Sequence, residues 1–232
     1  MTMVMTRIVS LSSDPLHNCF MKERAQSLGE EIANSISHGL GFLLAVAALP
    51  ILTFHAARDG SARHVIAASI FAATMIVLYL VSALYHALPA GRAKVVLRRL
   101  DHASIFLFIA GSYTPFLFGV LWGVGGWTLF VMVWACAVFG VVFKALNRLQ
   151  HPLWSTGLYL AMGWQVLTVL DPLLQRMPAA GIGWLVAGGA AYTGGVLFYL
   201  LDNRLRYAHF AWHLFVIGGS VCHFFAALGY AV

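Results

Sequence analysis

The stretch "GLGFLLAVAALPIL" at residues 39–52 decides the fold class, because it is apolar throughout apart from glycine and proline. A second stretch, "LFVMVWACAVFGVVF" at residues 129–143, is just as apolar. Strands of a membrane barrel alternate apolar and polar residues with a period of two, and neither stretch does so. Both therefore predict helices that cross a membrane, each of which needs about 20 apolar residues.

The composition of the whole chain agrees with this interpretation. Of its 232 residues, 61% are hydrophobic and 9% are charged, whereas soluble domains are about half apolar and about a quarter charged. We expect an all-α membrane protein, a seven-transmembrane-helix bundle over residues 32–232 that follows a short cytoplasmic segment at 1–31. The first 31 residues contain no apolar run that could serve as a signal-peptide core, so the mature chain is expected to start at or near Met1. The expected spans are 32–56, 65–88, 101–121, 124–143, 152–172, 181–201 and 207–230.

The distribution of basic residues predicts the orientation of the bundle. Basic residues are retained on the cytoplasmic side of a membrane. Eleven of the 14 lysines and arginines fall on the side of the N-terminus, and the other side has Arg58, Arg63 and Arg176. The N-terminus is therefore predicted to be cytoplasmic and the C-terminus to lie outside. This asymmetry explains the net charge of +6, so we expect no nucleic-acid partner.

The predicted topology brings polar residues of several spans to one depth near the cytoplasm. Ser82 and His86 end the second span, Asp101 starts the third, and His209 and His213 start the seventh. Residues four apart share one face of a helix, so His209 and His213 can present two imidazoles to one point. With His86 they would supply three ligands for a zinc ion, leaving the fourth position to water.

An open zinc site of this kind has a known chemistry. The ion lowers the pKa of its bound water to about 7, Asp101 would hold that water or take its proton, and Ser82 would orient an imidazole or contact a substrate carbonyl. The metal itself stays open at this point, because imidazole also suits iron, copper and nickel.

Simpler roles are available for several of these side chains. Histidines inside membranes often only form hydrogen bonds between helices, and we expect this, or a role supporting the metal ligands, for His38 and His102. Asp101 could be a helix cap only, and Glu30, Glu31 and Asn34 could simply cap and charge the start of the first span. His223 lies roughly 15 Å further along its helix than His213, so we expect it to bond another helix deep in the bundle.

The order of motifs resembles a known family. The segments "EEIANSISHGLG", "SALYH", "RRLDHASIFLFIAGSYTPF", "HFAWH" and "CHFF" are similar to those of the hemolysin III proteins, the bacterial branch of the progestin and adipoQ receptor family, and the resemblance runs from Glu30 to the C-terminus. It implies a seven-helix bundle with its N-terminus inside and a zinc ion near the cytoplasmic face. It also implies the ligands His86, His209 and His213, with Asp101 holding the zinc-bound water and Ser82 as the family's serine.

Three functions follow as hypotheses. Animal adiponectin receptors of the family resemble ceramidases in their site, so the first is a zinc-dependent hydrolase of a lipid amide or ester in the bacterial cytoplasmic (inner) membrane. Its substrate would enter sideways from the inner leaflet, and its role would lie in lipid or membrane-energy homeostasis. The alternatives are a pore-forming cytolysin, as the family's name suggests, and a membrane sensor or receptor with structural zinc. The oligomeric state stays open.

Overall fold

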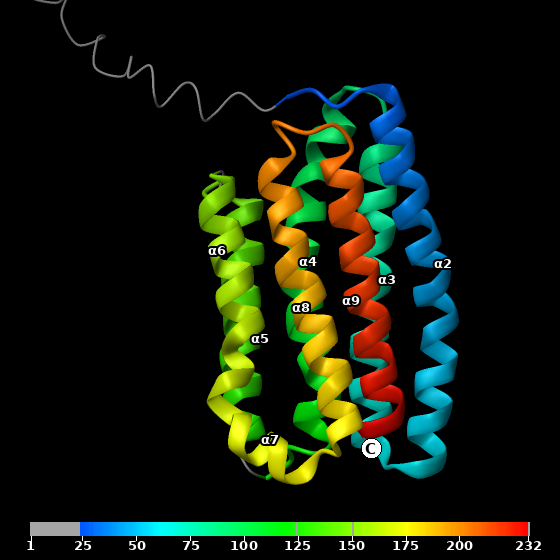
Figure 1. Ribbon diagram of the computed structural model, residues 1–232, viewed down its shortest axis with the longest axis vertical. Helices are drawn as coiled ribbons and strands as arrows, with labels where there is room; N and C mark the ends of the chain where they lie inside the picture. The colour runs from blue at the N-terminus through cyan, green and yellow to red at the C-terminus, as the bar shows by residue number, and fades with distance from the viewer. Residues whose placement is uncertain (1–23, 124, 150, 232) are drawn as a thin grey trace, which may run out of the picture.

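Helices make up every element of the part of the chain that the structure, a computed structural model, describes: residues 24–123, 125–149 and 151–231. The helices lie side by side along the long axis of the molecule (Figure 1), which confirms the all-α prediction. Arg7 and Lys22, which contributed to the charge asymmetry, lie outside the described residues, as does most of the segment 1–31. The elements are α2 (Leu28–Asp59), α3 (Ala62–Ala87), α4 (Arg92–Phe118), α5 (Gly126–Ala145), α6 (Pro152–Gly163), the 3-10 helix η1 (Trp164–Val169), α7 (Leu170–Arg176), α8 (Ala179–Leu201) and α9 (Ala208–Tyr230).

Within the described residues, six helical segments are long and apolar enough to cross a membrane: α2, α3, α5, the run Pro152–Arg176, α8 and α9. Large apolar side chains such as Leu28, Phe54 and Trp154 are exposed on them, as expected of surfaces that face lipid. The protein is therefore a multi-pass integral membrane protein. Helix α4 is long but more polar, and it buries Asp101, Ser112 and Thr114. A seventh span through α4 stays a prediction.

Helix α4 lies at the centre of the bundle, where it packs against α3, α5, α6 and α9. Helix α2 packs against α3 and α9, and α8 packs against α9, as Figure 1 shows. At one end of the bundle α2, α4 and α9 begin and α3 ends. We call it the histidine end, because His86, His209 and His213 lie there. At the opposite end α2 and α9 end.

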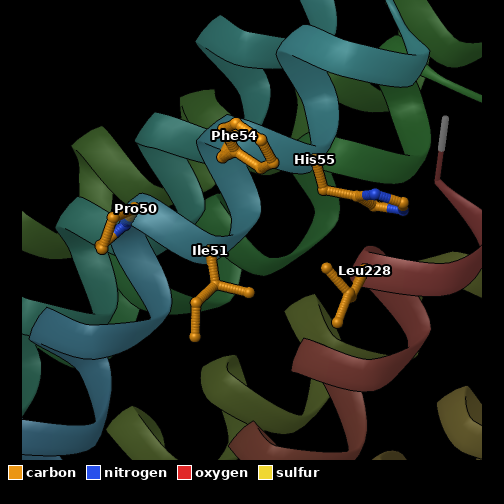
Figure 2. Close-up of a pocket in the computed structure, with 5 residues that line it drawn as sticks. All are labelled: Pro50, Ile51, Phe54, His55 and Leu228. Atoms are coloured by element: carbon orange, nitrogen blue, oxygen red, sulfur yellow. The ribbon is translucent and has the colours of Figure 1, made fainter.

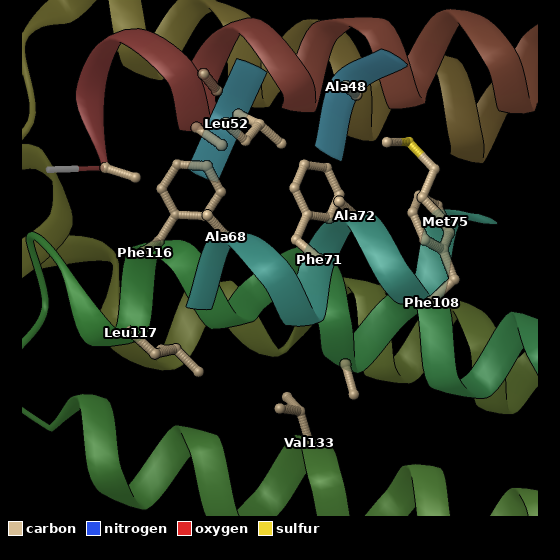
Figure 3. Packing of buried hydrophobic residues seen from close by; sticks show 14 of the residues in the cluster. Ala48, Leu52, Ala68, Phe71, Ala72, Met75, Phe108, Phe116, Leu117 and Val133 are labelled. Atoms are coloured by element: carbon tan, nitrogen blue, oxygen red, sulfur yellow. The ribbon is translucent and has the colours of Figure 1, made fainter. Parts of the chain in front are cut away.

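The helices interlock through a core of aromatic and small side chains (Figure 3). Phe71 of α3 is fully buried and stacks on Phe108 of α4, with ring centroids 6.1 Å apart. Helices in lipid associate through close packing of this kind, which small residues allow. A Cβ at Gly188 of α8 would lie 2.3 Å from Cδ2 of His223 in α9. Gly188 therefore lets α8 and α9 approach closely.

Helices α2 and α4 begin four and nine residues earlier than the sequence predicted. Helix α2 starts at Leu28 rather than residue 32, because Ser27 and Glu30 form a capping box that adds a turn. Helix α4 starts at Arg92 rather than residue 101. Its first nine residues, "RAKVVLRRL", combine charge with strong helix formers, so a segment expected to be a loop continues as helix.

The predicted span 152–172 is not one regular helix. The α-helix ends at Gly163 and gives way to η1 before α7 begins. The hydroxyl of Tyr113 in α4 accepts a hydrogen bond from Val166 N–H at 3.0 Å and lies 3.0 Å from the Met162 carbonyl. It thereby satisfies backbone groups that the break frees, as a membrane interior requires.

Candidate metal centre

Three imidazoles from two helices converge at the histidine end. His86 lies in the last turn of α3, and His209 and His213 lie in the first two turns of α9. Their ring centroids are 5.2, 5.1 and 4.7 Å apart, and one nitrogen of each ring lies within 4.8 Å of the others. His86 and His213 are buried and His209 is half-buried. The three predicted ligands thus form a group that could hold a metal ion.

Each of these imidazoles has a polar partner at Nδ1. His86 Nδ1 lies 2.7 Å from Oε2 of Glu31 in α2. His209 Nδ1 lies 3.1 Å from Oδ2 of Asp202, in the loop before α9. A carboxylate only accepts hydrogen bonds, so Nδ1 of both rings carries the proton and Nε2 keeps its lone pair. Metal-binding histidines are commonly fixed by a carboxylate in this way.

The third imidazole has the same tautomer for a different reason. His213 Nδ1 lies 3.2 Å from Ser37 Oγ of α2. The single hydroxyl proton of Ser37 is donated to the Asn34 carbonyl at 2.9 Å, so Ser37 Oγ accepts from His213 Nδ1–H. All three Nε2 atoms are therefore free to donate a lone pair. That of His86 is buried without a hydrogen-bond partner among the described residues.

The donor set fits a zinc ion. Three neutral imidazoles are a common protein contribution to a zinc site that keeps an open position. A tetrahedral ion with Zn–N bonds of about 2.0–2.1 Å holds its ligands about 3.3 Å apart. The three nitrogens lie within 4.8 Å of one another. The distances between them would shorten by roughly 1.5 Å at most when the ion binds.

Asp101 and Ser82, the other predicted site residues, lie at the same end. Asp101 of α4 is 7% exposed, and its carboxyl lies within electrostatic range of His209 and beside Ser82. Ser82 of α3 is one turn before His86. Its Oγ is buried, and no partner in the described part of the chain lies in good hydrogen-bond geometry to it. The proximity of the two groups agrees with their predicted roles, which stay predictions.

The remaining histidines of the motifs do not join the group. His38 of α2 stacks on His213, with ring centroids 3.5 Å apart, and both of its ring nitrogens are buried without a partner among the described residues. The backbone carbonyl of His102 accepts a hydrogen bond from Tyr159. His223 lies edge-on to the Tyr192 ring and bonds the backbone of Leu185 in α8. The expected contact of His223 with another helix is thus present, away from the metal ligands.

The sequence did not identify the groups that orient the ligands. Glu30 takes part in capping α2, as the partner of the N-cap residue Ser27, but Glu31 reaches across to His86. No sequence motif assigns a role to Ser37 or Asp202. One usable signal was present for Glu31, because it lies seven residues before His38, two turns along one helix face. None was present for Asp202, which acts from a loop.

Two cavities lie at the opposite end of the bundle. The first, of about 560 Å³, is a groove lined by Pro50, Ile51, Phe54 and His55 of α2 and by Leu228 of α9 (Figure 2). The second, which lies beside it, is much smaller, about 20 Å³. His55 contributes to both. These cavities are therefore distinct from the group formed by the three converging imidazoles.

Comparison with known proteins gives consistent relatives. The profile of the family "Haemolysin-III related" matches residues 26–224. The chain is 42% identical to "Hemolysin-3 homolog" of Bacillus subtilis over 206 residues, 89% of this chain and 96% of the relative. It is 40% identical to "Hemolysin-3" of Bacillus cereus over 212 residues, 91% and 96% of the two chains. The human "Monocyte to macrophage differentiation factor" is 28% identical over 229 residues, 91% of each chain. No solved structure matches. The chain belongs to the haemolysin-III related family, as its motifs predicted.

Proposed function

We propose that the protein is a zinc-dependent hydrolase of a lipid amide or ester, with its site near the cytoplasmic face of the bacterial inner membrane. One observation carries the proposal: three imidazoles converge, with one nitrogen of each within 4.8 Å of the others, and every Nδ1 is engaged, so that each ring keeps its Nε2 lone pair. A purely structural role of intramembrane histidines needs no such common tautomer, because any hydrogen bond between helices would serve.

The surrounding residues support hydrolysis. A zinc ion bound here would supply a Lewis acid and a water of lowered pKa. Asp101 is buried next to His209, where its carboxylate can hold a water molecule and take a proton from it. Ser82 Oγ, which lies beside the Asp101 carboxyl, can donate to a substrate carbonyl. An acyl chain already in the bilayer would bring that carbonyl in sideways from the inner leaflet.

A second candidate is a membrane sensor in which the zinc is structural. It uses the same three imidazoles, because they could hold an ion whether or not a substrate is turned over there. A hydrolase needs an approach for its substrate at the histidine end. The two functions therefore differ in turnover and not in metal content.

The test combines metal content and turnover. Protein purified in lipid nanodiscs is analysed for metals and is incubated with a ceramide and with a phospholipid, whose cleavage is followed by mass spectrometry. We expect about one zinc ion per chain and cleavage of at least one lipid. His209→Ala combined with His213→Ala should remove both, and Asp101→Asn should retain zinc but lower the rate by about 10²–10⁴-fold.

The matched control is His55→Ala, a histidine at the opposite end, which should change neither measurement. Absence of zinc from the wild type, or hydrolysis that survives loss of both histidines, would overturn the proposal. Bound zinc without cleavage of either lipid would also overturn hydrolysis, and would leave the structural-zinc sensor.

A further inference from the structure

The residues directly before α2 bind the loop between α8 and α9. The backbone N–H of Arg24 donates to Asn203 Oδ1 at 2.9 Å. The side-chain Nε of Arg24 donates to the Asp202 carbonyl at 3.3 Å. Gln26 Nε2 donates to Asp202 Oδ2 at 3.1 Å. The segment 24–27, which we call the strap, therefore joins two parts of the chain that are almost 180 residues apart.

The strap is in turn held by the first turns of α2. The guanidinium of Arg24 makes two hydrogen bonds to the Glu30 carboxylate, at 2.9 and 2.6 Å. This pairing raises the pKa of Arg24 above its ordinary value. Glu30 also accepts from the backbone N–H of Tyr207 at 2.8 Å, and Asn34 donates to Gln26 Oε1 at 2.6 Å. Glu30 and Asn34 are 2% and 0% exposed, so these anchors are fixed inside the bundle.

One oxygen atom connects the strap to the imidazole group. Asp202 Oδ2 accepts from Gln26 Nε2 and also lies 3.1 Å from His209 Nδ1. Asp202 is in a loop and its side chain is 24% exposed, so neither a helix nor burial fixes its rotamer. The hydrogen bond from Gln26 supplies that restraint, together with the Arg24 guanidinium, whose Nη2 lies 3.7 Å from Asp202 Oδ1. His86 and His213 are held differently, because Glu31 and Ser37 both belong to α2 itself.

We propose that the strap positions His209 for metal binding, with Gln26 fixing Asp202 and Asp202 fixing the imidazole. The inference rests on the metal centre of the proposed function and is independent of lipid hydrolysis. Gln26 and Asp202 are positioning residues, because neither would touch the ion. Helix α2 and its strap thus orient all three imidazoles, two directly and the third through the loop.

The experiment measures zinc affinity of the full-length protein in nanodiscs by competition with a chromophoric chelator. Removal of a group that orients a metal ligand typically weakens binding by 10–100-fold, and we expect a loss in this range for Asp202→Ala. Asp202→Asn, which keeps an acceptor oxygen, should recover most of the affinity. Gln26→Ala should give a smaller loss, and Gln26→Glu a larger one, since it would place two carboxylates together.

A double variant tests whether Gln26 acts through Asp202. If it does, Gln26→Ala lowers the affinity in the wild type and has no further effect when Asp202 is already alanine. The ligand-field spectrum of the Co²⁺-substituted protein is a second readout. The spectrum should change in Gln26→Ala. It should stay unchanged in Asp59→Asn, which alters the aspartate of an aspartate–histidine pair at the opposite end. A merely structural role of the strap would give additive losses and no spectral change, and either result would overturn the proposal.

His86→Ala separates this proposal from the metal centre itself. If His86→Ala binds zinc like the wild type, the three-histidine centre is wrong. If His86→Ala loses zinc while Asp202→Ala and Gln26→Ala bind normally, the centre stands and the positioning role of the strap is wrong. Should Gln26→Ala fold poorly, the comparison of Asp202→Ala with Asp202→Asn still decides whether Asp202 orients His209.

Discussion

The two ends of the bundle contain the same chemical pair in different settings. At the opposite end, His55 Nδ1 lies 2.9 Å from Asp59 Oδ2, one turn later on the same helix, and the side chains are 29% and 39% exposed. At the histidine end, His86 Nδ1 lies 2.7 Å from Glu31 Oε2, which belongs to another helix, and the histidine side chain is 1% exposed. The two Nδ1···O distances are alike.

The difference lies in what each pair fixes. A pair within one turn orients an imidazole relative to its own helix only, and an exposed pair contributes little to stability. A partner on another element fixes the ring relative to the bundle, and three such restraints hold the three imidazoles that converge. Histidine–carboxylate pairing alone therefore does not indicate a metal centre. A metal centre is indicated when several imidazoles converge and each is held by a residue of another element.

Replacement of a ligand should give the largest effect at the histidine end. His86→Ala removes one of three ligands and leaves Glu31 paired with Lys94, whose Nζ lies 2.8 Å from Oε1. Structural zinc sites bind with about 10–16 kcal/mol, so loss of a third of that should weaken zinc binding by roughly 10²–10⁴-fold. Isothermal titration in nanodiscs measures it. Equal zinc affinity in His86→Ala and His55→Ala would remove the difference between the two ends.

A smaller loss of zinc affinity should follow when His86 stays and the carboxylate that orients it is changed. Glu31→Gln keeps an oxygen that can accept from His86 Nδ1–H but removes the charge, and it leaves Lys94 without its carboxylate partner. We expect a loss of zinc affinity of about tenfold, at the low end of the range for groups that orient ligands. Asp59→Asn, the same change in the pair at the opposite end, is the matched control. Chelator competition shows whether only Glu31→Gln binds more weakly.

The sequence predicts the residues whose positions follow from spacing along a helix, but not those whose positions depend on helix rotation or on the path of a loop. The apolar runs give the spans, and the four-residue spacing of His209 and His213 puts them on one face, so the convergence with His86 was predictable. Glu31 faces His86 only because of how α2 is rotated about its axis, and apolar runs do not encode that rotation. Asp202 depends on the path of a loop. The early start of α4 at Arg92 was missed because charged helix formers and a polar loop have the same composition.

The smallest effect on stability and on zinc affinity is expected for His55→Ala, at the opposite end of the bundle. His55→Ala removes an imidazole whose partner, Asp59, keeps its hydrogen bonds to Arg58. Exposed pairs of this kind contribute about 0–1 kcal/mol, so thermal unfolding should shift by no more than a few degrees and zinc affinity should not change. His55 also lines the groove formed with Pro50, Ile51, Phe54 and Leu228. If His55→Ala weakened zinc binding as much as Glu31→Gln does, the two ends would be coupled through α2, and the centre could not be treated as a property of one end of the bundle.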